Sequence, residues 1–175
     1  MDELIRIIKY NDYTSLIDYG AEKSISDIIE YFVKSKKSPL WYIVKNDKQF
    51  DEYIFTYLID VLEADINIKN QDGQTLLMYC IEKGYLSMID MLISNDCDVN
   101  LQDNVGMSAL HYTVYNLDSN LVKLLLLSGI DVKLKDNCGQ TALDYLKNNF
   151  YHQHIEDPDK KRYECYDTIL KIIPS

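Results

Sequence analysis

The sequence lacks the features that mark several common classes of protein. Asp2 and Glu3 stand where a secretory signal needs positive charge, and no apolar run approaches the ~18 residues of a membrane span. The four cysteines show no C-x-x-C spacing, and no N-x-S/T acceptor occurs. Neither a disulfide framework nor a zinc site is therefore indicated. The glycine motifs of phosphate-binding loops are also missing. We expect a cytoplasmic protein without a cofactor, with nuclear entry left open.

Positive charge is scarce. The chain has 18 Lys and Arg against 28 Asp and Glu, which gives a formal net charge of −10. This balance repels phosphate backbones and anionic lipids, so we expect no nucleic-acid partner and no membrane partner. Lys34, Lys36 and Lys37 form a small basic cluster, which we interpret as part of a solvated loop. The apolar fraction of 47% is typical of a folded chain.

A motif recurs at one fixed spacing. Gly73, Gly106 and Gly139 are equally spaced along the chain. The neighbours of each glycine agree in type: an Asn or Asp three residues before it (Asn70, Asp103, Asp136), a Thr or Ser two after (Thr75, Ser108, Thr141) and a Leu four after (Leu77, Leu110, Leu143). The glycine suits a turn with positive φ, and the hydroxyl residue suits the N-cap of a following helix.

Each turn is followed by two short helical patterns. The second pattern runs over Leu86–Ser94 in one unit and over Asn120–Ser128 in the next, with apolar residues at helical spacing. Each unit then closes with an extended return, 98–100 or 131–133. The unit is therefore a turn plus a helix pair.

The repeat resembles the ankyrin family, whose unit of about 33 residues is a β-turn plus two helices with the signature T-P-L-H-x-A. The closest local matches are 108–113 (SALHYT) and 128–132 (SGIDV). The resemblance implies an all-α solenoid of stacked helix pairs joined by β-turn or hairpin tips. Met78 and Asp144 depart from the family's histidine, and Asp96 and Leu117 stand where Gly129 and Gly84 supply a glycine.

The repeat phase predicts a single domain over 1–175. Residues 1–33 form a degenerate N-terminal capping region, 34–69, 70–102 and 103–135 are repeats, and 136–175 is a C-terminal capping repeat with an inserted loop, 151–162. Pro158 and dense charge place that loop at the surface, before a closing helix over 163–173.

Three histidines are the obvious candidates for chemistry. His152 and His154 lie near acidic residues, but a loop with proline rarely preorganises metal ligands, so we expect no metal site. His111 occupies the histidine of the signature, which in the family hydrogen-bonds neighbouring turns. No nucleophile and orienting carboxylate are placed beside it, so we expect no enzyme.

The residues that packing does not dictate lie at the tips and at the exposed ends of the first helices. They predict a partner-binding face made of Gln71, Asp72, Gln74, Asn104, Val105, Met107, Tyr115, Asn116, Asn137, Cys138 and Gln140. Among these, Val105, Met107 and Tyr115 are candidate interface anchors because they are apolar or aromatic.

Amino-acid usage suggests a source for the chain. It has 16 Lys but 2 Arg, with 20 Ile, 15 Tyr, 12 Asn and only 4 Ala, which is typical of an A/T-rich coding genome. In a short ankyrin chain this bias resembles the poxvirus ankyrin proteins, a family of host-range and immune-evasion factors. The resemblance implies a monomer that binds a host signalling or restriction protein. A ubiquitin-ligase adaptor and a non-viral ankyrin scaffold or effector are the alternatives; five helix pairs fill the chain and leave no F-box-like segment.

Overall fold

The computed structural model describes residues 40–41, 44, 52–60, 64–147 and 158–172. The chain divides into two compact units, residues 1–68 and residues 69–175. In the described ranges all regular elements are α-helices, and the only strand-like features are isolated bridges. The helices are α5 (Glu52–Asp60), α6 (Leu76–Lys83), α7 (Leu86–Ser94), α8 (Ala109–Tyr115), α9 (Ser119–Leu127), α10 (Ala142–Lys147) and α11 (Pro158–Ile172).

In the first unit, apolar side chains around α5 are buried. They are Leu40, Trp41, Val44, Phe55 and Leu58. Trp41 occupies the position of the signature histidine, and its indole Nε1 donates a hydrogen bond to the carbonyl oxygen of Ile68 over 3.3 Å. The capping region predicted over 1–33 and the lysine cluster 34–37 lie outside the described residues.

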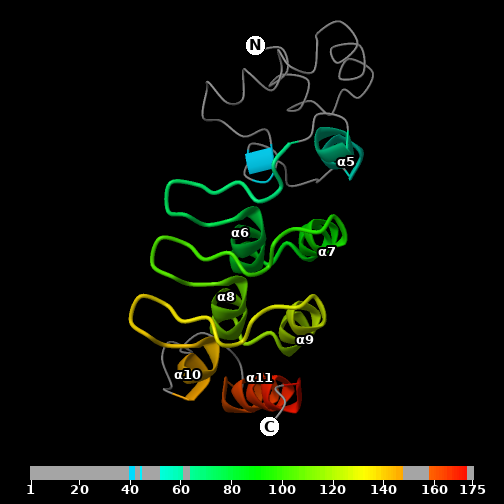
Figure 1. Cartoon of the computed structure of the whole chain (residues 1–175). Helices are drawn as coiled ribbons and strands as arrows, with labels where there is room; N and C mark the ends of the chain where they lie inside the picture. Colours follow the sequence, from blue (N-terminus) through cyan, green and yellow to red (C-terminus); the bar gives the residue numbers. More distant parts are fainter. Residues whose placement is uncertain (1–39, 42–43, 45–51, 61–63, 148–157, 173–175) are drawn as a thin grey trace, which may run out of the picture. The chain divides into compact units, whose positions relative to one another are not determined.

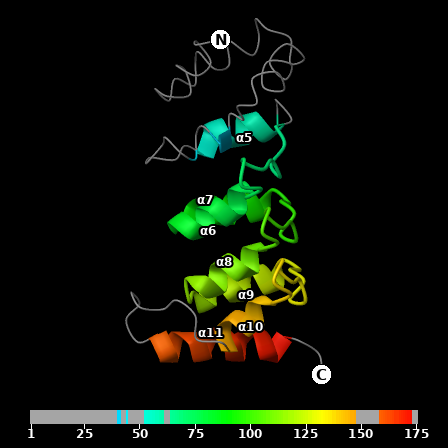
Figure 2. The same cartoon turned by 90° about the vertical axis from the view of Figure 1, so that its left-hand side faces the viewer.

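The second unit is a stack of helix pairs. Helices α6, α8 and α10 follow one another in one layer, and α7 and α9 form a second layer beside them (Figure 1). Long turns, which we call the tips, project from the first layer on the side away from the second. Figure 2 shows the helices side-on, with the tips following one another along the stack. Helix α11 closes the unit by packing on α9 and α10.

The helices of the second layer bury equivalent residues. In α7 these are Met88, Ile89 and Leu92, and at the same positions of the next repeat α9 buries Leu121, Val122 and Leu125. Burial of the same stripe in successive repeats removes apolar surface from water between neighbours, which is the main stabilising term in a solenoid. The predicted helix Leu86–Ser94 is confirmed, and the next one begins and ends one residue earlier than expected.

Each tip contains the predicted glycine in the left-handed region. The φ angles are 76° at Gly73, 82° at Gly106 and 78° at Gly139. A single antiparallel bridge closes the base of each tip, and the three bridges join Lys69 to Thr75, Gln102 to Ser108 and Lys135 to Thr141. The tips are therefore one-bridge hairpins, and the all-α repeat fold expected from the sequence is confirmed.

The departures from glycine at the helix ends have a structural cost. Asp96 and Leu117 adopt φ angles of 56° and 52°, whereas Gly129 and Gly84 have 83° and 72° at the corresponding corners. A side chain in this region is crowded by its own backbone. The chain therefore holds two strained corners where the family pattern has glycine.

The prediction of an inserted loop over 151–162 is wrong for the C-terminal end of that range. Residues 158–162 form the first turn of α11, which begins at Pro158 rather than at Tyr163. Proline is well suited to the first turn of a helix because its missing N–H would have no partner there and its φ is already helical. Proline and dense charge are typical of a loop, so the sequence pattern alone does not indicate this helical turn.

Candidate protein-interaction surface

One side chain organises each tip. Asn70 accepts hydrogen bonds through Oδ1 from the backbone N–H groups of Asp72 and Gln74, both over 2.9 Å. Asp103 holds the next tip in the same way, through the N–H groups two and four residues on, at 3.0 and 2.8 Å. Asp136 repeats the arrangement at 2.9 and 2.8 Å. The recurring Asn or Asp therefore fixes the backbone of the tip from inside.

Neighbouring tips are joined by hydrogen bonds. The backbone N–H of Asn104 donates to the carbonyl oxygen of Asp72 over 3.0 Å, and that of Asn137 donates to Val105 over 2.9 Å. Their side-chain amides also donate to the preceding tip, from Asn104 to Gln71 over 2.9 Å and from Asn137 to Asn104 over 3.0 Å. The three tips thus form one hydrogen-bonded ladder, so their exposed residues are presented in a fixed arrangement.

The ladder requires glycine at its closest approach. A Cβ atom on Gly73 would lie 2.4 Å from Oδ1 of Asn104, and one on Gly106 would lie 2.7 Å from the backbone nitrogen of Asn137. Among the described residues, and apart from its chain neighbours, a Cβ atom on Gly139 at the last tip would meet nothing within 4 Å. Two of the three phase-defining glycines therefore serve packing between tips as well as backbone conformation.

His111 is a structural bridge, as expected from the repeat signature. Its side chain is fully buried. Nδ1 lies 3.1 Å from the backbone nitrogen of Ser108 and 2.9 Å from its hydroxyl, while Nε2 lies 3.1 Å from the carbonyl oxygen of Gln140 in the next tip. Burial lowers the pKa of His111 below its ordinary value, against the opposing effects of Gln140 and two carboxylates. The neutral ring therefore joins two repeats.

The other residues at the histidine position behave differently. Met78 is buried, and its backbone N–H donates to Oγ1 of Thr75 over 3.3 Å. Asp144 caps its own helix, because its Oδ2 accepts from the N–H of Thr141 over 3.0 Å and from the hydroxyl over 2.8 Å. These bonds lower the pKa of Asp144. Both substitutions keep the start of the helix satisfied, but the bridge from the ring to the next tip is specific to His111.

A column of tyrosines on the first helices was missed by the sequence analysis. Tyr79, Tyr112 and Tyr145 occupy equivalent positions in three successive repeats, and each is half-buried. The hydroxyl of Tyr112 donates to Oδ2 of Asp103 over 2.8 Å, and that of Tyr145 donates to Asp136 over 2.6 Å. The signal was present, since these residues occupy the variable position of the signature in every one of these repeats.

Gln74 joins the first tip to two helices. Its Nε2 donates to the Tyr112 hydroxyl over 2.9 Å and to Oε2 of Glu82 over 3.0 Å, while its Oε1 accepts from Asn70 over 3.0 Å. Glu82 lies at the end of α6, and Tyr112 lies on α8. The tips and the ends of the first helices are therefore parts of one surface, which we call the tip surface: residues 71–74, 104–107 and 137–140 with Tyr79, Glu82, Lys83, Tyr112, Tyr115 and Asn116.

The eleven predicted binding residues fall into two groups. Four use their side chains inside the structure: Gln74, Asn104, Asn137 and Asn116, of which Asn116 donates to the Ile81 carbonyl over 2.9 Å. The others are Gln71, Asp72 and Cys138, which are exposed, Met107 and Gln140, which are half-buried, Val105, which is 56% exposed, and Tyr115, which is 45% exposed. The structure brings both groups together on the tip surface.

No catalytic arrangement is evident among the residues that the structure describes. Burial raises the pKa of the Cys80, Cys97 and Cys165 thiols to about 12, so these three are protonated and weakly nucleophilic. In the described ranges no three His, Cys, Asp or Glu side chains cluster in a way that could hold a metal ion. His152 and His154 lie outside those ranges. Likewise, none of the described helices is long and apolar enough to cross a membrane.

Stacked turn–helix–helix units with a rigid row of exposed tips define a class of protein: repeat modules that bind other proteins through surface residues. The chain belongs to the ankyrin-repeat family, because the family model for ankyrin repeats, with three copies, matches residues 4–103 and 40–136. The repeats of this family are non-catalytic interaction modules. No curated protein matches the chain.

Proposed function

We propose that the chain is a viral factor that acts as a monomer in the host cytoplasm, binds a host signalling or restriction protein through the tip surface, and blocks an innate immune response. The observation that carries the binding site is the hydrogen-bonded ladder of tips with Val105 and Tyr115 exposed on it. The viral assignment rests on the amino-acid usage of an A/T-rich genome and on the resemblance to short poxvirus ankyrin proteins.

Rigidity favours the tips as the binding site. Ordering a mobile side chain at an interface costs about 0.5–1.5 kcal/mol, and a surface that is already ordered avoids much of that cost. Tyrosine in particular offers a large contact area with few rotatable bonds. Each anchor that meets a complementary pocket contributes about 1–3 kcal/mol, whereas charges at the rim mainly change the association rate.

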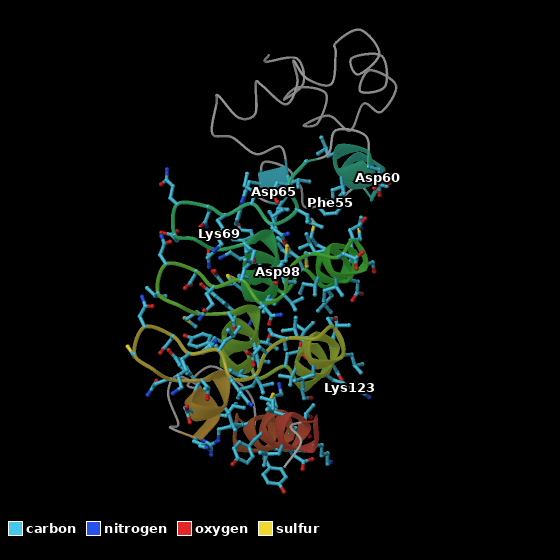
Figure 3. The ribbon with its side chains drawn as sticks, in the orientation of Figure 1. Phe55, Asp60, Asp65, Lys69, Asp98 and Lys123 are labelled. Atoms are coloured by element: carbon cyan, nitrogen blue, oxygen red, sulfur yellow. The ribbon has the colours of Figure 1, made fainter. Side chains whose placement is uncertain are left out.

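Proximity labelling in transfected cells tests the proposal, with the triple variant Val105→Ala/Met107→Ala/Tyr115→Ala compared with the native chain. The matched control is Lys123→Ala/Leu127→Ala on α9, where Leu127 is 74% exposed. Figure 3 shows Lys69 at the base of the first tip and Lys123 on the side of the unit away from the tips. We expect the triple variant to lose the labelled immune-signalling partner and the control to retain it, with both variants as helical as the native chain by circular dichroism.

The opposite pattern, in which the α9 variant loses the partner and the tip variant keeps it, would show that the working face lies on the second layer. Labelling of cullin subunits in place of signalling or restriction proteins would support the ligase-adaptor alternative and overturn the blocking role. Capture by the native chain should also inhibit the pathway of the captured protein in a reporter assay.

A further inference from the structure

The chain already holds one cation on its tyrosine column. Nζ of Lys83 lies 5.3 Å from the centroid of the Tyr79 ring and 2.6 Å from Oε1 of Glu82. A positive charge over an aromatic face is attracted by the electron-rich ring, and a neighbouring carboxylate strengthens the attraction. The combination of ring and carboxylate on this surface therefore suits an amino or guanidinium group.

Tyr112 in the next repeat also has carboxylates nearby, Asp103 of its own repeat and Glu82 of the preceding one, but a different residue stands at the cation position. Asn116 occupies the position equivalent to Lys83, and its amide is used in the bond to Ile81. The Tyr112 hydroxyl is bound to Asp103, and Gln74 links it to Glu82. The pKa of Tyr112 is raised, first by burial and then by the hydrogen bond to Asp103, and the charges of Asp103 and Glu82 add smaller effects in the same direction. The surroundings of this hydroxyl are therefore negative.

The third tyrosine is arranged differently. The Tyr145 ring meets the edge of the His111 ring, with centroids 5.5 Å apart and an interplanar angle of 88°. Part of its surface is thus used by the preceding repeat. Of the three tyrosines, Tyr112 combines a half-buried ring, two nearby carboxylates and an uncharged residue at the position of Lys83.

We propose that the protein partner places an arginine side chain on the Tyr112 ring, near the carboxylates of Glu82 and Asp103. This inference rests on the proposed function of the tip surface and adds the chemistry of the partner. Arginine suits the site better than lysine because its planar guanidinium stacks on aromatic rings and presents several N–H donors to carboxylates. Tyr115 lies one turn further along α8 and is 45% exposed, so it extends the aromatic contact. The net charge of −10 favours a basic partner over an acidic one.

The structure offers a conservative way to remove the negative charge. Asn70 performs in the first tip the same backbone-holding role that Asp103 performs in the second. Asp103→Asn therefore keeps the turn while it removes the carboxylate, and Glu82→Gln keeps an acceptor for Gln74. The double variant D103N/E82Q tests charge at the site, and D60N/D90N, which removes two exposed carboxylates from α5 and α7, is the control with the same net charge.

The experiment is selection of a random dodecapeptide phage library on the immobilised full chain and on each variant, followed by fluorescence anisotropy with the selected synthetic peptides. We expect arginine to be enriched on the native chain and on D60N/D90N but not on D103N/E82Q. Replacing the critical arginine of a selected peptide by glutamine should weaken its binding at least tenfold to the native chain and less than threefold to D103N/E82Q. The salt dependence of binding should fall in parallel.

Selections with no excess of arginine on the native chain over D103N/E82Q would overturn the inference. Should the selected peptides be neutral and still lose affinity for V105A/M107A/Y115A, the tip surface would remain the binding site with a different partner chemistry. Peptides that bind this triple variant as well as the native chain would instead overturn the tip surface itself. The two proposals therefore fail in distinguishable ways.

Discussion

At the scale of single residues, His111 stands out because both of its ring nitrogens are used, one within its own repeat and one across a repeat boundary. Ser108 lies at one nitrogen and the Gln140 carbonyl at the other, within an environment closed to water. Protonation would add a charge and a second donor to a ring that currently needs one acceptor nitrogen toward the Ser108 N–H. The buried neutral ring therefore makes this contact sensitive to pH.

We predict that the free energy of unfolding falls as the pH drops below about 6.5, the ordinary pKa of histidine. The folded pKa of His111 is lowered, so the unfolded chain takes up a proton first, and stability is lost from that point until the pH reaches the folded pKa. Urea unfolding at a series of pH values between 7.5 and 5.5 measures the slope. His111→Gln should flatten it, and since His152 and His154 are present in both proteins, their contributions cancel. Equal slopes would contradict the prediction.

Residue-level roles were only partly predictable. The repeat phase predicts the turn glycines and the capping hydroxyls, because both depend on local backbone geometry, whereas the role of His111 is implied by the resemblance to the ankyrin family. For Asn104 and Asn137 the sequence predicts side chains that bind a partner, whereas in the structure their amides donate hydrogen bonds to the preceding tip. An asparagine at a turn looks the same in sequence whether its amide meets water or a neighbouring carbonyl, and only the spacing between repeats decides which occurs.

At the scale of elements, two of the corners that follow the helices have a non-glycine residue at positive φ, and the two residues differ in burial. Asp96 and Leu117 adopt a left-handed conformation in which glycine is unstrained. Asp96 is exposed, whereas Leu117 is only 3% exposed and packs in the core. The same backbone strain is therefore accompanied by apolar burial at one corner and not at the other.

We predict opposite effects of glycine at these two corners. Asp96→Gly should stabilise the protein by about 0.5–1 kcal/mol, because it relieves the strain and removes no buried contact. Leu117→Gly should destabilise it by about 1–3 kcal/mol, because the loss of a buried leucine exceeds the same relief. Chemical denaturation of both variants and of the native chain gives the sign of each change in the free energy of unfolding. Destabilisation by Asp96→Gly would show that the corner is not strained.

Helix boundaries are predicted accurately where the apolar pattern extends to the end of the helix, and less accurately where it does not. Helix α7 begins and ends where its apolar spacing predicts, and its buried residues Met88, Ile89 and Leu92 follow that spacing. Helix α11 begins five residues before the expected Tyr163, because its first turn, from Pro158, is rich in charged residues and so carries no apolar signal. Sequence periodicity detects only the part of a helix that touches a neighbour.

At the scale of the whole molecule, the second unit is held together along two lines, the apolar stripes of the helices and the ladder of the tips. The stripes supply most of the stabilisation, as burial does in any solenoid. The ladder adds hydrogen bonds between consecutive tips and depends on the close approach at Gly73 and Gly106. A change at one of these glycines therefore affects two repeats, not one.

We predict that Gly106→Ala is more destabilising than Gly139→Ala. Both introduce a side chain at positive φ, which costs about 1–2 kcal/mol. At Gly106 the added Cβ would also lie 2.7 Å from the backbone nitrogen of Asn137, so the tips must separate, whereas at Gly139 it would meet none of the described residues beyond its chain neighbours. Thermal unfolding of the two variants compares the costs. Similar unfolding midpoints for the two variants would mean that the tips can move apart at Gly106 without loss of stability.

The tips also show how such a surface can change over generations. Asp72, Val105 and Cys138 occupy one and the same place in three successive tips, and all three are exposed. An acid, a branched aliphatic chain and a thiol are tolerated there because the flanking asparagines, aspartates and glycines already satisfy the backbone. Mutations at this place should therefore have little effect on folding, and under the proposed function they would change partner binding. If the partner protein changes during evolution, these three positions could change with it while the repeat fold stays the same.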